Sequence, residues 1–466
     1  MRLVRLAASS ALLACLAPGL ARADADLLLA RALGDELTPT PRALAVGPDD
    51  ALVIAGRGAQ RWSAAGEPLA TVASGALDDV AATADGWAIV GADGLVRLDA
   101  LGEPLWHVPA AQLGPHAARW RVALGGAGTV AALADGRVHV FSAAGARLAS
   151  VDAGDVALAA LAVDDARATV LAVGTATRAG CDAAPAQVAT LLAFDLRGAP
   201  RWRAYGHAAA DMCAVERDLS AATRGVDVTV GGDGLVYFLG EADGAASVFR
   251  AHAQHPGAAA PNVVFDRYSD PDEARSTTAY FARLDGDGEP LAGQFLGLPA
   301  ADGPPARLSV RAIAADRRGV VVIAGATDRS PYAPDERPTS EALGQPVGFI
   351  HVADPDLGGR RWHLVEDLPG EHAVVDLALA DDIALALLAG AGGDAVLAVP
   401  LGDASDPASE VEKRPNPDTQ GTFGYESGIS GSDPTCYCDA DAPRPAAPLA
   451  VCVLVLAGLP RPGRRK

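Results

Sequence analysis

Two histidines and a run of acidic residues stand close together in one stretch of the chain. His252 and His255 are spaced as two ligands of a metal site could be, and SDPDEARS (269–276) offers carboxylate oxygens of the kind that bind Ca²⁺. With Asp270 and Asp272, the same histidines form the set from which a hydrolase or lyase would draw its acid and base. No third ligand follows at a regular spacing, so the sequence favours solvated histidines and a polar turn.

The segment DGDGE (285–289) is superficially similar to a calcium-binding loop. Pro290 follows it directly, and the Gly and distal Glu that an EF-hand loop requires are missing. The segment also aligns with SAAGEP (63–68) and ALGEP (100–104), so we interpret it as a hairpin turn, for which Asp and Gly suit the backbone angles. The chain contains no nucleophile elbow, phosphate loop or zinc-protease motif. We therefore assign no catalytic residue, no cofactor-binding residue, no metal ligand and no cofactor.

These candidate residues are set in a chain of repeated hairpins. One hairpin recurs six times as an extended run that breaks at a Gly-centred turn and resumes toward a large apolar residue, as in RLDALGEPLWHV (97–108). A second hairpin lies upstream of each, as in DVAATADGWAIVG (79–91), and a seventh upstream copy occurs at 375–390. Each unit offers about four short strands. The sequence therefore predicts an all-β fold, a β-propeller of about seven four-stranded blades within residues 24–403.

The last predicted unit lacks a clear fourth strand. We expect DLLLARAL (26–33), or the weaker SEVEK (409–413), to complete it. Sharing one blade between the two ends of the chain would close the ring and hide two sheet edges. The alternatives are a ring of six or eight blades and a β-sandwich with long insertions, although a sandwich would not need so many similar units.

Tryptophan recurs at one position of the repeat. Trp106, Trp202 and Trp362 each follow the Gly-centred turn. We predict that these indole rings pack between neighbouring blades and do not form a platform for a ligand.

The long insertions all fall at one end of the predicted ring. In a four-stranded meander, the first and third turns share one end, whereas the second turn and the connection to the next blade share the other, which we call the connection face. Insertions occur in second turns at 175–187, 241–277 and 327–347, and in connections at 204–224 and 298–307. We expect them to project from the connection face and to form a binding surface. The alternative is that they are merely tolerated loops.

Two cysteines belong to these insertions. Cys181 lies in a long second turn and Cys213 in the connection that leaves the same blade. They are the only cysteines within residues 24–403, and an exported protein meets an oxidising compartment. We therefore expect a Cys181–Cys213 disulfide; two separate buried thiols are the alternative.

The N-terminus has the three parts of a secretory signal. A basic start, MRLVR, is followed by an apolar stretch and by Ala21-Arg22-Ala23. We predict a signal peptide over 1–23 that is cleaved after Ala23. The alternative is a lipoprotein signal with Cys15 as the lipidated residue.

The C-terminus has the order of a processed sorting tail. Residues 404–446 are rich in Pro, Asp, Ser and Gly and predict a disordered stalk. The stalk contains Cys436 and Cys438, and 447–466 follows as a short apolar segment that ends in arginines and a lysine. This order of features resembles the C-terminal sorting domains of myxobacterial surface proteins. The resemblance implies recognition and cleavage near the cysteines, with the protein left attached to the outer surface.

The repeats themselves resemble those of secreted bacterial β-propeller proteins. The resemblance is carried by 226–240 with 280–291 and by 310–327 with 348–362. The D-x-x-G-x-x-x-W pattern is also similar to that of quinoprotein propellers, in which it is structural. No matching set of cofactor residues occurs in this chain.

The net charge of the chain excludes some classes of partner. The formal net charge is −20 at pH 7, which argues against nucleic acid and against anionic lipid as partners. We expect an exported, cell-surface-anchored, non-enzymatic module that binds a glycan, a peptide or a protein. It would meet the export and sorting machinery, and a membrane only through its tail. The alternatives are an extracellular hydrolase or lyase and a passive structural protein, and, for location, the periplasm or the medium.

Overall fold

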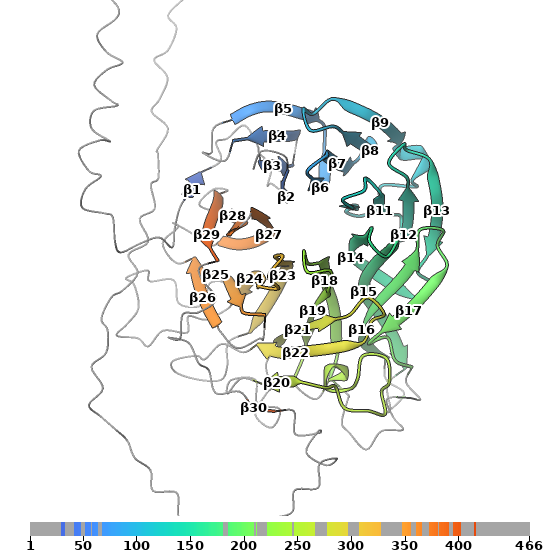
Figure 1. The fold of residues 1–466 in the computed structure, drawn as a ribbon, viewed down its shortest axis with the longest axis vertical. Coiled ribbons are helices and arrows are strands. Elements are labelled where there is room, and N and C mark those ends of the chain that lie inside the picture. The colour runs from blue at the N-terminus through green and yellow to red at the C-terminus, as the bar shows by residue number, and fades with distance from the viewer. Residues whose placement is uncertain are drawn as a thin grey trace, which may run out of the picture.

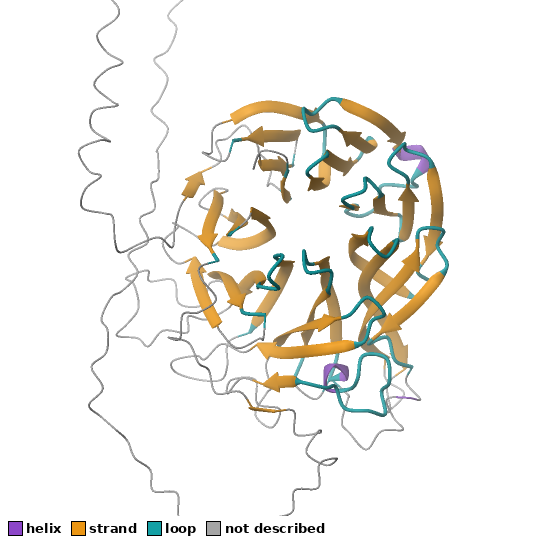
Figure 2. Ribbon diagram, in the orientation of Figure 1, coloured by secondary structure: helices purple, strands orange, loops and turns teal. Residues whose placement is uncertain are grey.

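The computed structural model is a closed ring of β-sheets (Figures 1 and 2). It describes residues 29–32, 42–47, 52–56, 58–63, 68–179, 185–208, 211, 221–244, 247–265, 277–296, 307–327, 347–355, 360–365, 372–380, 382–390, 395–401 and 414–415. The ring consists of seven four-stranded blades, as the hairpin repeats predict. None of the described helices is long and apolar enough to cross a membrane.

Each blade is an antiparallel meander that runs from the centre of the ring outward. Blade one comprises β2 (Ala43–Val46), β3 (Leu52–Ala55), β4 (Gly58–Trp62) and β5 (Pro68–Ser74). Blade two comprises β6 (Leu77–Thr83), β7 (Gly86–Gly91), β8 (Gly94–Leu98) and β9 (Pro104–Pro109). Blade three comprises β10 (Arg121–Leu124), β11 (Val130–Ala134), β12 (Arg137–Phe141) and β13 (Arg147–Asp152). Blade four comprises β14 (Val156–Asp164), β15 (Thr169–Ala179), β16 (Pro185–Asp195) and β17 (Pro200–Ala204). Blade five comprises β18 (Thr223–Val230), β19 (Val236–Ala242), β21 (Thr278–Leu284) and β22 (Pro290–Leu296). Blade six comprises β23 (Leu308–Ala315), β24 (Val321–Thr327), β25 (Val347–Ala353) and β26 (Arg360–Val365).

Blade seven takes its fourth strand from the other end of the chain. It contains β27 (His372–Ala380), β28 (Ile383–Gly390) and β29 (Ala395–Pro400), and β1 (Leu29–Ala32) pairs antiparallel with β29. The prediction that 26–33 completes this blade is confirmed, whereas its alternative, 409–413, lies outside the described residues. The closing strand hides the outer edge of β29, which would otherwise be free to pair with another chain.

The hydrophobic core lies between adjacent blades. The two central strands of a blade contact neighbouring blades on both faces, so they are largely buried: all six residues of β7 and all seven of β19 are buried, whereas the hairpin of β15 and β16 is partly exposed at the connection face. Alanine is frequent in these contacts, for example Ala131 and Ala172 between blades three and four. Small side chains allow the inner parts of the blades to approach one another, and the larger aromatic side chains fill the wider gaps farther out.

Two of the repeated tryptophans join neighbouring blades, as predicted. Trp106 of β9 donates a hydrogen bond from Nε1 to the backbone oxygen of Ala143 in blade three (2.9 Å), and Trp202 of β17 donates to that of Gly286 in blade five (2.9 Å). Each ring packs against a turn glycine of the next blade, Gly145 or Gly288. Trp362 lies in β26, and its side chain is outside the described set.

The third turns are held by aspartate, which confirms the interpretation of residues 285–289. One carboxylate oxygen of Asp285 accepts hydrogen bonds from the backbone N–H groups of Asp287 and Glu289, both at 2.9 Å. The turns that begin at Asp99 and Asp195 repeat this arrangement. Gly288 has a positive φ of 81°, a conformation that glycine adopts without strain. These contacts are turn chemistry, in which the carboxylate binds its own backbone.

The longest insertion departs from its predicted position. Residues 241–277 were expected to project from the connection face, but their described part folds back along the outer edge of blade five. Within it, β20 (Val263–Phe265) pairs parallel with β22, and Phe249 and Val263 are buried. The reason is hydrophobic burial, because Phe249 joins an aromatic cluster with Tyr205 and Tyr280. By contrast, the insertion in blade four extends the hairpin of β15 and β16 up to the pair Ala179 and Pro185, at the connection face.

A short strand occurs within the region predicted to be a disordered stalk. β30 (Arg414–Pro415) pairs antiparallel with β20 at the edge of blade five. The chain beyond blade seven therefore touches the outer rim of the ring. The remainder of 404–446, and all of 447–466, lie outside the described residues.

The closing strand can be tested by truncation. We expect a chain that begins at Leu33 to be less stable than one that begins at Leu29 by roughly 2–4 kcal/mol, because it loses a row of backbone hydrogen bonds worth about 1 kcal/mol each. Urea unfolding of the two chains measures the difference. Equal midpoints would show that β1 contributes nothing to closure of the ring.

The contact between tryptophan and glycine can be tested at Gly145. Its φ is 82°, and a Cβ there would lie 2.8 Å from the Trp106 ring. We expect Gly145→Ala to cost about 1–3 kcal/mol, since the left-handed conformation alone costs about 1–2 kcal/mol for alanine. Gly136→Ala is the control, because its φ of 70° is also left-handed but a Cβ there meets no atom within 4 Å. Thermal unfolding compares the two variants, and equal effects would contradict the packing role.

Candidate functional site: the central cavity

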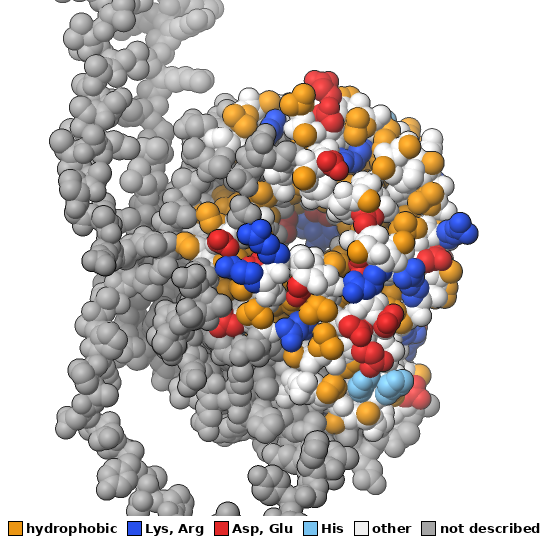
Figure 3. Space-filling model, in the orientation of Figure 1, with side chains coloured by type: hydrophobic (Ala, Val, Ile, Leu, Met, Phe, Trp, Pro, Cys, Tyr) orange, Lys and Arg blue, Asp and Glu red, His pale blue; other side chains and the backbone are white. Residues whose placement is uncertain are grey.

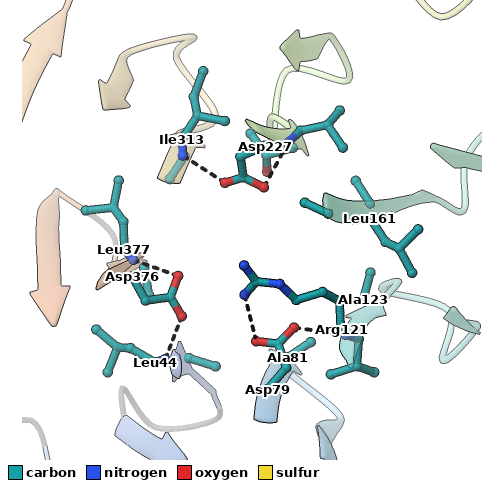
Figure 4. A pocket seen from close by; sticks show the side chains of 18 of the residues that line it. Leu44, Asp79, Ala81, Arg121, Ala123, Leu161, Asp227, Ile313, Asp376 and Leu377 are labelled. Carbon is teal, nitrogen blue, oxygen red and sulfur yellow. Dashed lines mark hydrogen bonds and ion pairs between the residues drawn. The ribbon is translucent and has the colours of Figure 1, made fainter. Parts of the chain in front are cut away.

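The first strands of all seven blades, which we call the inner strands, enclose a cavity of about 470 Å³ at the centre of the ring (Figure 4). The space-filling view shows the molecule hollowed at this point (Figure 3). Most of the lining is alanine, valine, leucine and isoleucine. Five charged side chains interrupt it, each from a different blade: Asp79, Arg121, Asp227, Arg311 and Asp376.

The charged side chains form a layer at one depth of the cavity. Every inner strand begins at the connection face and ends at its first turn. The charged residues occupy the beginnings and middles of their strands, whereas Leu124, Val230 and Leu379, at or near strand ends, line the apolar part. The charged layer therefore lies nearer to the connection face.

Three of the charged residues occupy the same place in their strands. The inner strands β6, β18 and β27 each contain a register irregularity, and Asp79, Asp227 and Asp376 come directly after it. A bulge of this kind bends a strand and re-aims its side chains. In each case the carboxylate turns toward the inner strand of the next blade.

Each of these carboxylates binds the backbone of the next blade. The backbone N–H of Val122 donates to Asp79 (2.9 Å), that of Ile313 to Asp227 (2.9 Å) and that of Leu44 to Asp376 (2.7 Å). Asp227 and Asp376 also accept the N–H of the residue that follows them, each at 2.9 Å. The three aspartates thus join blade two to three, five to six and seven to one.

Arg121 is the cation that these carboxylates share. Its Nη1 lies 3.8 Å from Oδ1 of Asp79, and its Nε donates to the backbone oxygen of Ala159 in blade four (3.2 Å). In Figure 4 the guanidinium extends into the middle of the cavity, where Asp227 and Asp376 face it from the other side. Its positive charge lowers the pKa of all three carboxyl groups.

Burial nevertheless outweighs that attraction. Desolvation raises the pKa of Asp227 to about 7, and it raises the pKa of Asp376, with help from the charge of Asp79, to about 6. The pKa of Asp79 is also raised by burial. Near neutral pH the cavity therefore contains carboxyl groups that exchange protons with the solvent, beside a permanent positive charge.

A second charged cluster lies where blades one, two and three meet. Asp78, which is 1% exposed, forms an ion pair with Arg42, is hydrogen-bonded to Nε2 of His116 and accepts the backbone N–H of Trp120 (3.2 Å). Arg119 donates from Nε to the backbone oxygen of Asp78 (3.1 Å). The buried carboxylate is thus fully engaged in holding the connection between blades two and three.

The histidines that the sequence singled out lie far from this cavity, at the outer rim. The rings of His252 and His255 stack with centroids 4.9 Å apart, and Nε2 of His252 lies 3.1 Å from Oε2 of Glu289 in the third turn of blade five. Burial lowers the pKa of His252 by more than Glu289 raises it. Among the described residues, no group of three His, Cys, Asp or Glu side chains is arranged to hold a metal ion.

Several predicted residues lie outside the described part of the chain. They are Asp270 and Asp272 of the acidic run, the proposed disulfide partners Cys181 and Cys213, the signal cleavage residue Ala23, and Cys436 and Cys438 of the tail. The predictions made for them stand as predictions.

Sequence reasoning missed the aspartates of the cavity. The signal was present, because three of the repeated upstream hairpins begin with an aspartate at the same place, in DVAAT (79–83), DVTV (227–230) and DLALA (376–380). A recurring acid among apolar strand residues indicates a buried carboxylate with a fixed partner. The partner itself, a backbone N–H of another blade, has no signature in the sequence.

The role of Asp376 between blades can be tested by comparing two substitutions. We expect Asp376→Ala to lower the free energy of unfolding by about 1–3 kcal/mol, because the buried N–H of Leu44 loses its acceptor. Asp376→Asn keeps an oxygen in place and should cost less. Urea unfolding at pH 5, where the wild-type carboxyl group keeps its proton, measures both. Equal losses would mean that the hydrogen bond contributes little.

The chain was compared with family models and with curated proteins. No family model matches the chain, and no curated protein matches it. The chain is therefore assigned by its own architecture alone: an all-β ring of seven four-stranded blades around a charged central cavity.

Proposed function

We propose that this protein is an exported, surface-held, non-enzymatic module that binds an extracellular glycan, peptide or protein through its central cavity. A β-propeller is commonly a binding or interaction module. The partner, or a protruding group of it, would enter from the connection face, where the charged layer lies. The charged side chains would orient the polar part of the partner, and the apolar strand ends would receive the rest.

The observation that carries this proposal is the convergence of five charged side chains from five blades on one cavity. Its volume of about 470 Å³ falls within the range of about 300–1,000 Å³ that is usual for ligand sites. Mostly apolar walls with a few placed polar groups are also usual for such sites. The cavity admits a small molecule, a sugar unit or a side chain, but not a folded domain.

The surface location rests on the two ends of the chain. The basic and apolar N-terminus with its site at Ala23, and the tail with Cys436 and Cys438, support export followed by tail processing. We expect the native protein from the cell surface to have an intact mass that begins at Asp24 and ends near Cys436 or Cys438. Mass spectrometry of the recovered protein tests this. A mass that retains residues 448–466 would contradict cleavage of the tail and attachment of the protein to the cell surface.

Binding in the cavity can be tested with one substitution at two places. We expect Ala81→Phe, which places an aromatic ring in the cavity, to abolish binding to any glycan or peptide that the wild-type protein retains on an array. Ala70→Phe is the matched control, because Ala70 is exposed on the outermost strand β5 of blade one. Circular dichroism of both variants checks that the ring still folds.

Loss of binding in the Ala70→Phe variant alone would place the ligand-binding surface on the outer rim of the ring. An array without any ligand would favour a passive structural role. Turnover of a retained ligand would favour a hydrolase or lyase.

A further inference from the structure

The cavity contains more acid than its central cation can balance. Asp79, Asp227 and Asp376 face one another across it, with Arg121 between them. When all three carboxyl groups are ionised, they place three negative charges around the guanidinium of Arg121, and Arg311 is the second cation of the lining. The same groups accept the hydrogen bonds that join three pairs of neighbouring blades. Their charge therefore affects how strongly these blades hold together, and we call the three boundaries the joints of the ring.

Other charged groups near these joints are few. On the elements packed against β18, Arg311 belongs to β23 and Glu241 to β19, where Glu241 accepts the N–H of Val310 (2.9 Å). Near Asp376, the further charges are those of Asp79, Arg119 and Arg121. None of these additional groups donates a hydrogen bond to Asp227 or Asp376, whose donors are backbone N–H groups.

Ionisation therefore changes the balance at two joints. A charged carboxylate binds an N–H more strongly than a neutral carboxyl group does, but it must also lose its hydration and face the other negative charges. Burial is the largest influence on both Asp227 and Asp376, so the neutral form is the one that the closed ring favours. Opening a joint returns its carboxylate to water and removes the cost of ionisation.

We propose that the central cavity makes the ring a proton-controlled assembly: with Asp227 and Asp376 protonated, the boundaries between blades five and six and between blades seven and one stay closed, and with both ionised these boundaries open locally more often. This behaviour belongs to the ring itself and does not depend on the ligand proposed above.

The pH range follows from the raised pKa values. The pKa values in the closed ring are about 7 for Asp227 and about 6 for Asp376, against about 3.9 for an aspartate in water. The contribution of each proton to stability is complete below about pH 4 and is lost as the pH rises through 6 to 7. The two boundaries are therefore tightest in mild acid and loosest above neutrality.

The chain contains an internal control for this effect. At the boundary between blades four and five, the backbone N–H of Ala189 donates to the hydroxyl oxygen of Thr223 at 2.9 Å. This bond also joins two neighbouring blades, although its donor lies on the third strand β16 and not on an inner strand, and its acceptor does not titrate. Comparison with this amide separates a local change at the other two from a change in global stability.

Hydrogen exchange of these three amides tests the proposal on the full chain. From pH 5 to pH 8, with the intrinsic exchange rates divided out, we expect the protection factors of the Ile313 and Leu44 amides to fall roughly tenfold or more relative to that of Ala189. Parallel changes at all three amides would overturn the proposal, because they would reflect global stability alone.

A substitution assigns the effect to its residue. Asp227→Asn keeps an oxygen acceptor but cannot ionise, so the relative protection of the Ile313 amide should become independent of pH while that of Leu44 still falls. Glu241→Gln is the matched variant at the same boundary and should leave the fall at Ile313 in place. A fall at Ile313 that persists in Asp227→Asn, or that disappears in Glu241→Gln, would refute the role of Asp227.

Discussion

The ring depends on acceptors for the backbone N–H groups that its inner strands turn toward the centre. These groups cannot pair with another strand, because the inner strand is the edge of its sheet. At three boundaries the preceding blade supplies the acceptor as an aspartate directly after a bulge, and between blades five and six Glu241 of β19 also accepts the N–H of Val310. An unpaired buried N–H costs about 1–3 kcal/mol, so these side chains determine how the blades meet.

The same requirement creates the charged cavity. An aspartate that reaches the next blade must lie at the wall of the lumen, and several blades use this solution. Their carboxyl groups therefore gather around one small space, together with Arg121, which connects blade three to the backbone of blade four. Joints between blades and a charged, ligand-sized cavity arise from one set of side chains. The structural role and the proposed binding role consequently rest on the same residues.

How far the sequence predicts the site differs from residue to residue. The turn at Asp285 is local, since the carboxylate binds N–H groups two and four residues away, and aligning the repeats was enough to identify it. The cavity brings together Asp79, Asp227 and Asp376 from blades far apart in the chain, so the recurring aspartate of the repeats did not show that these carboxyl groups meet. His252 shows the opposite case: its place in a second turn predicted the connection face, but burial of Phe249 and Val263 holds the described part of the insertion at the outer rim.

The sequence by itself determined the all-β ring, its blades, the closing strand near the N-terminus and the packing of Trp106 and Trp202 between blades. These features repeat or follow from local turn chemistry, so each copy reinforces the others. Only the tertiary structure decided that aspartates of blades two, five and seven meet around Arg121, and that their carboxyl groups are desolvated there. The physical reason is that a pKa shift and a cavity are properties of a closed ring. They depend on distances between blades, which appear only when the first and last strands pair.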